Sequence, residues 1–96
     1  MEKARVELHN QSDAWIWITA YTVSGATRHP YDSFCVAPHR NEVHFVKRGY
    51  LDEIRGEVTH KNCTHPVMLD RTLGYDGKAP YYLTGSNGTY KFWHTP

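Results

Sequence analysis

Two cysteines and three histidines near them are the residues of this sequence best suited to chemistry. Cys35 precedes His39, and His60, Cys63 and His65 lie close together later in the chain. Thiolates and imidazoles are the ligands that Zn²⁺ prefers in a tetrahedral site. Two cysteines whose Cα atoms lie about 4.4–6.8 Å apart form a disulfide instead, in an oxidising compartment.

Three interpretations of this cluster follow, and we favour a disulfide between Cys35 and Cys63. The second is a pair of buried free thiols, which behave as small hydrophobic side chains. The third is a zinc site drawn from Cys35, His39, His60, Cys63 and His65. A Cys-x2-Cys motif, which would have supported zinc strongly, is missing from the sequence. We therefore expect no cofactor, with zinc as the alternative if both thiols stay reduced.

The segment 14–23 is the strongest predicted strand, because it is rich in β-branched and aromatic residues. Its alternation places Trp15, Trp17 and Tyr21 on the face opposite the aliphatic residues. One interpretation is a central strand that is covered on both faces. The other is an exposed aromatic strip that contacts sugar rings, a lipid interface or a protein, since Trp and Tyr bury a large area at low entropic cost.

Lys47, Arg48 and Tyr50 form a second candidate binding group at a predicted turn, with a merely solvated turn as the alternative. We name no catalytic residue. The sequence favours a non-enzymatic binding module, for example an inhibitor or effector. Its expected partner is another protein, with a glycan or a membrane surface as alternatives. A zinc-binding protein and a small hydrolase with a histidine base are the other functional hypotheses.

Composition limits these hypotheses. The chain has 96 residues and 11.1 kDa, which fits one domain over 1–96. Eleven Lys and Arg against ten Asp and Glu give a net charge of +1, so we expect no nucleic-acid partner. We find no signal-peptide pattern and no apolar run long enough to span a membrane. The sequence leaves the compartment and the oligomeric state open.

Apolar residues recur with a period of two along most of the chain, which predicts short strands separated by turns. About seven or eight such strands favour an antiparallel β-sandwich, immunoglobulin-like or similar, with a small barrel as the alternative. The Asn87-Gly88 pair predicts a tight hairpin near the C-terminus. Residues 29–32 are predicted to form a loop, because Pro30 cannot donate to a strand ladder.

A second predicted hairpin pairs 42–47 with 53–59. Its register places Val43 and Phe45 inward, pairs His39 with His60, and brings Cys35 near Cys63. The predicted core is Val6, Leu8, Ile16, Ile18, Val43, Phe45, Ile54, Val58, Val67, Leu69 and Phe92.

Overall fold

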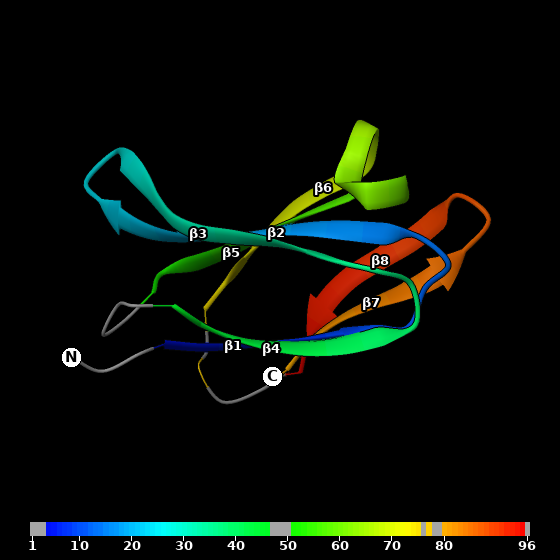
Figure 1. Ribbon diagram of the computed structural model, residues 1–96. Helices are drawn as coiled ribbons and strands as arrows, with labels where there is room; N and C mark the ends of the chain where they lie inside the picture. Colours follow the sequence, from blue (N-terminus) through cyan, green and yellow to red (C-terminus); the bar gives the residue numbers. More distant parts are fainter. Residues whose placement is uncertain (1–3, 47–50, 76, 78–79, 96) are drawn as a thin grey trace.

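The computed structural model describes residues 4–46, 51–75, 77 and 80–95, which form two packed four-stranded sheets (Figure 1). The first sheet contains, in spatial order, β4 (Arg40–Val46), β1 (Ala4–Asn10), β7 (Tyr81–Ser86) and β8 (Thr89–His94). The second contains β3 (Thr27–Val36), β2 (Trp15–Ser24), β5 (Glu53–His60) and β6 (Thr64–Gly74). A single 3-10 turn, η1 (Lys61–Cys63), joins β5 to β6.

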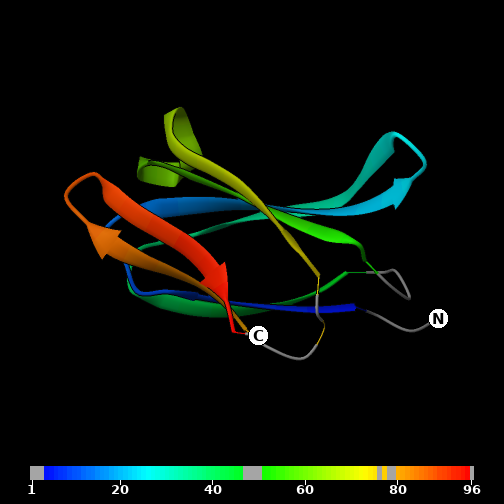
Figure 2. The same ribbon diagram turned by 180° about the vertical axis from the view of Figure 1, so that it is seen from behind.

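Neighbouring strands are antiparallel, except that β1 and β7 run parallel. The two sheets lie face to face, as the view from behind also shows (Figure 2). The predicted β-sandwich is therefore confirmed, and the described strands do not close into a barrel. The tight hairpin is confirmed too, because Ser86 pairs with Thr89 and both Asn87 and Gly88 have positive φ.

The core lies between the sheets and is built from alternate residues of nearly every strand. Seven residues of the predicted core are fully buried: Val6, Leu8, Ile16, Ile18, Ile54, Val58 and Phe92. Val67 and Leu69 on the edge strand β6 are only half-buried. Burial of such side chains is the main stabilising contribution to a domain of this size.

The predicted orientation of β4 is wrong. Val43 and Phe45 are 43% and 57% exposed, whereas His44 is half-buried and stacks on Phe34 with ring centroids 3.7 Å apart. The cause is the pairing partner, since β4 pairs with β1 in the first sheet and not with β5. That register places His44 beside the inward-facing Val6, so the alternate residues of β4 face outward.

The predicted loop at 29–32 is also wrong, because these residues belong to β3. Tyr21 pairs with Pro30 and Ala20 with Asp32, so one extra residue bulges out of β3 at this point. A proline is tolerated here because β3 is an edge strand and the ladder is already interrupted.

The buried side chain of Asn10 connects the two sheets at one end of the sandwich. Its amide nitrogen lies 2.8, 3.3 and 3.1 Å from the carbonyl oxygens of Ala14, Val36 and Ala37. Its amide oxygen accepts hydrogen bonds from the backbone N–H and the hydroxyl of Ser12. One amide thus satisfies polar groups of the β1–β2 turn and of the end of β3.

Replacing Asn10 by alanine should lower the free energy of unfolding by about 3 kcal/mol, because it leaves several buried polar groups without partners. Urea unfolding of Asn10→Ala measures this loss. The matched control is Gln11→Ala, whose side chain is exposed in the turn that follows β1 and should change stability by less than about 0.5 kcal/mol. Equal effects of the two substitutions would contradict a special role for Asn10.

The sheets approach closely at Gly56 on β5. A Cβ atom at this position would lie 2.8 Å from the Phe92 ring and 3.0 Å from Ile16 Cδ1. We expect Gly56→Ala to destabilise the protein by about 1–3 kcal/mol, because the buried ring has nowhere to move. Gly74→Ala is the control, since a Cβ there meets no atom within 4 Å. Thermal unfolding of both variants tests the difference, and a neutral Gly56→Ala would contradict the close packing.

Candidate functional site

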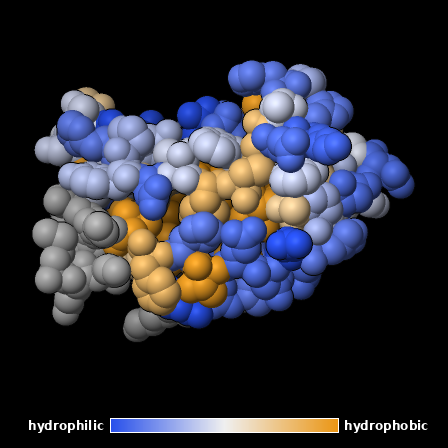
Figure 3. All heavy atoms as spheres, in the orientation of Figure 1, coloured by the Kyte–Doolittle hydropathy of each residue, from blue (hydrophilic) through white to orange (hydrophobic). Residues whose placement is uncertain are grey.

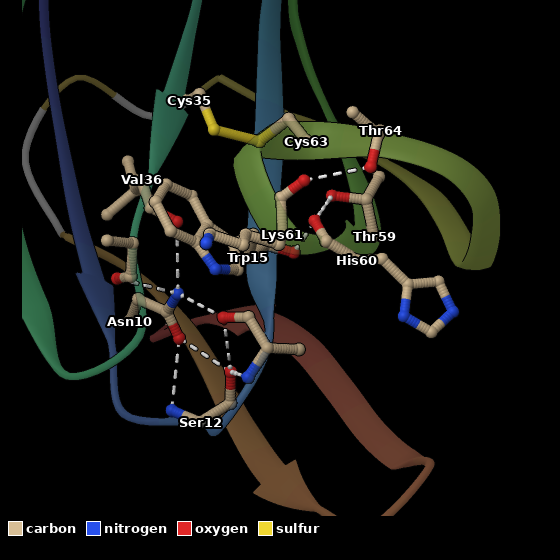
Figure 4. Close-up of a disulfide and its surroundings, with 12 residues drawn as sticks. Asn10, Ser12, Trp15, Cys35, Val36, Thr59, His60, Lys61, Cys63 and Thr64 are labelled. Carbon is tan, nitrogen blue, oxygen red and sulfur yellow. Dashed lines mark hydrogen bonds between the residues drawn. A yellow bond between two sulfur atoms is a disulfide. The ribbon is translucent and has the colours of Figure 1, made fainter.

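The Cys35–Cys63 disulfide is present, with Cα atoms 6.1 Å apart (Figure 4). Cys35 lies on β3 beside Trp17 of β2, and Cys63 lies in η1, directly after β5 on the other side of β2. The disulfide therefore holds η1 over the first residues of β2. The predicted disulfide is confirmed, although the 42–47 and 53–59 hairpin from which its proximity was inferred does not form.

The predicted zinc ligands do not come together in this structure. Both sulfur atoms are bonded to each other, and no group of three or more metal-binding side chains gathers within the described residues. The expected pairing of His39 with His60 is wrong, since His60 pairs with Thr64 and His39 lies in the turn between β3 and β4. His65 is the one histidine of the set that faces a hollow together with Cys63.

The aromatic strip lies where the alternation of β2 predicts. Ile16 and Ile18 are buried in the core, and Trp15, Trp17 and Tyr21 lie on the outer face of the second sheet. All three aromatic residues are half-buried, which is between the two predicted extremes. Within the described part of the chain, no protein group accepts a hydrogen bond from the indole N–H of Trp15 or Trp17. By contrast, Trp93 Nε1 donates to Thr84 Oγ1 over 3.2 Å.

A first hollow of about 260 Å³ lies over Trp17. Glu57, the cross-strand neighbour of Trp17, contributes a carboxylate to the lining of this hollow. Thr59 contributes a hydroxyl and His65 an imidazole, and Cys63 and Val67 complete the wall. The hollow therefore combines one aromatic side chain with groups that can donate and accept hydrogen bonds.

A second hollow of about 550 Å³ lies over Tyr21, further along β2. Arg55 donates two hydrogen bonds to Asp70, 2.9 Å from Nε to Oδ1 and 2.5 Å from Nη2 to Oδ2. This bidentate contact lowers the pKa of the Asp70 carboxyl. Arg28 makes a similar ion pair with Glu53, 2.5 Å from Nε to Oε1.

The two hollows are neighbours, since Arg55 of the second lies 3.7 Å from the Glu57 carboxylate of the first. At one end η1 rises above the sheet, and at the other the β2–β3 hairpin bends the same way (Figure 1). The space-filling view shows the outline dipping between them (Figure 3). The outer face of the second sheet is thus a trough that runs along β2.

A third hollow of about 420 Å³ adjoins Trp15 and shares Thr59 with the first. Asp13 lies there and accepts hydrogen bonds from Tyr90 (2.6 Å) and from the backbone N–H of Asn87 (3.1 Å). These bonds lower the pKa of Asp13, and the neighbouring carboxylate raises that of Tyr90. The contact ties the β1–β2 turn to the β7–β8 hairpin and so fixes one wall of this hollow.

Lys47, Arg48 and Tyr50, the second candidate binding group, lie outside the described residues. Sequence reasoning missed the charged residues of the trough, chiefly Glu57, Arg55 and Asp70. Their outward direction follows from the alternation of residues 53–59, but their position beside Trp17 and Tyr21 depends on which strands are neighbours.

Comparison with protein-family models, curated proteins and solved structures finds no significant match. Among the described residues, no helix has the length and apolar character needed to cross a membrane.

Loss of the disulfide should lower the free energy of unfolding by about 3.5 kcal/mol, because the bridge restrains residues 28 positions apart in the unfolded chain. Urea unfolding of Cys35→Ala/Cys63→Ala, compared with the oxidised protein, measures the loss. Alkylation of the denatured, unreduced protein should add no mass, and two alkyl groups should appear only after reduction. Two reactive thiols without reductant would contradict the bridge.

Proposed function

We propose that this protein is a non-enzymatic carbohydrate-binding module whose ligand lies in the trough along β2. The observation that carries the proposal is the pair of adjoining hollows over Trp17 and Tyr21, each with an aromatic side chain beside carboxylate, hydroxyl and basic groups. A concave site that mixes apolar walls with a few oriented polar groups is the usual form of a ligand site.

This combination matches the chemistry of a sugar. A pyranose ring has an apolar C–H surface that packs on an indole or phenol ring, while its hydroxyls exchange hydrogen bonds around the edge. Glu57 accepts such bonds, and the unclaimed indole N–H of Trp17 donates one. Arg55 and Asp70 offer a planar donor and acceptor pair in the neighbouring hollow. Two adjoining hollows suit successive residues of an oligosaccharide.

The charges of the trough favour a neutral glycan. Arg28 and Arg55 are paired with Glu53 and Asp70, and Glu57 adds one further negative charge. An anionic sugar would meet this excess of carboxylates. Such a floor also argues against a protein partner for this face, because Asp and Glu are depleted at the centres of protein interfaces. A membrane surface attracts unpaired Lys and Arg beside an apolar face, whereas both arginines of this trough are paired with carboxylates.

Screening of immobilised neutral and acidic oligosaccharides should retain the protein on neutral ones, and titration calorimetry should then give the affinity. Trp17→Ala should weaken binding at least about tenfold, because it removes the stacking surface. Glu57→Gln should weaken it by about tenfold, because the charged acceptor is lost while the shape is kept.

Trp93→Ala is the matched control, since Trp93 lies in the other sheet and its indole N–H is bonded to Thr84. It should bind as the wild type does. No retention on any glycan, or equal losses for Trp17→Ala and Trp93→Ala, would reject the trough as a sugar site. New reducing ends in the retained oligosaccharides would instead support the hydrolase hypothesis.

A further inference from the structure

The edge strand β4 is a second surface that is suited to binding, and it is independent of the proposed sugar site. It pairs with β1 over its whole length, Arg40 to Val46, without any register shift. No described strand pairs with its other side. An edge of this kind presents a row of backbone N–H and C=O groups to an incoming strand.

The other three edge strands carry features that discourage pairing. β3 contains Pro30 and a bulge, and β6 contains Pro66 and two register shifts against β5. β8 carries Lys91 and lies beside β6. Prolines, bulges and charged side chains, above all lysine, are the usual protection of sheet edges. Within the described residues, β4 has no proline, lysine or bulge, and its charged side chains are those of Arg40 and Glu42.

The side chains of β4 are also unusual for an exposed strand. Val43 and Phe45 are two of the four large hydrophobic residues exposed in the described chain, and both lie on the outer face of the first sheet. The space-filling view looks onto the side of the sandwich where β3 and β4 form the edges, and it shows hydrophobic surface beside β4 (Figure 3). Exposed apolar residues on an unprotected edge indicate a partner.

The sequence of β4 is complementary to itself. An antiparallel pair of β4 strands centred on Val43 places Glu42 of each copy opposite His44 of the other. Shifting one strand by two residues in either direction keeps the outward-facing residues on the same face, but it places Glu42 opposite Glu42 or His44 opposite His44. Of the registers that overlap by five or more residues, only the centred one sets the Glu42 carboxylate against an imidazole that can donate a hydrogen bond to it, whereas carboxylate against carboxylate places like charges directly opposite and destabilises a sheet. It also joins Val43 and Phe45 of both copies into one apolar stripe across the junction.

We propose that two copies of this chain associate through β4, antiparallel and centred on Val43, to form a continuous eight-stranded sheet. The backbone hydrogen bonds of the edge supply the affinity. The Glu42–His44 contacts between copies set the register, and they replace the contact of 2.9 Å that these side chains make within one chain. The interface is isologous, so association stops at the dimer.

Sedimentation equilibrium over micromolar to millimolar concentrations tests the proposal. The wild type should be a dimer, and Val43→Lys should raise the dimer dissociation constant at least about tenfold, because it sets two like charges face to face at the centre. Ser33→Lys, which adds the same charge to the outer face of the edge strand β3, is the matched control and should remain dimeric.

Glu42→Lys should also dissociate the dimer, and the exchange Glu42→His/His44→Glu should restore it, because the exchanged pair is again self-complementary. Circular dichroism confirms that each variant is folded. A wild type that stays monomeric up to about 1 mM would overturn the proposal. So would a dimer that survives both Val43→Lys and Glu42→Lys, whatever the effect of Ser33→Lys.

Discussion

The buried amide of Asn10 sets how the two sheets meet at one end of the sandwich. Its donors reach carbonyl oxygens at the start of β2 and the end of β3, and its oxygen orders the intervening turn through Ser12. The disulfide lies near this end and holds η1 over β2 (Figure 4). The Asp13 contacts with Asn87 and Tyr90 then attach the β7–β8 hairpin to the same turn. The position of Trp15 and Trp17 in the trough depends on this pinned end.

Strand positions could be predicted from the sequence because alternation is a local property, and the facing of β2 followed from it. The facing of β4 could not be predicted, although its alternation was recognised. In Arg40–Val46, hydrophobic residues point to both faces of the strand, Val43 and Phe45 to one face and Val46 to the other. The choice between them is made by β1, a strand distant in sequence, and by the stacking of His44 on Phe34.

The site was predicted in part for a similar reason. Two cysteines in a short chain suggested their own bridge, and the bridge exists, but by a different route from the one inferred. β3, β2 and β5 are neighbours in one sheet, and η1 then crosses β2. The same neighbours place Glu57 beside Trp17 and Asp70 beside Glu57. The order of the strands cannot be deduced from any single segment, so the charged residues of the trough could not be predicted from the sequence.

The parallel pairing of β1 with β7 has a consequence for how the chain reaches this structure. β1 occupies an interior position between β4 and β7, and the β1–β2 turn contacts a residue 77 positions away. The second neighbour of β1 is β7, which follows all four strands of the second sheet in the chain. Non-local pairings of this kind must close long loops before they gain stabilising contacts, which makes folding slow. Until β7 pairs with it, one side of β1 is an unpaired edge, which exposes the first sheet to misassociation during folding.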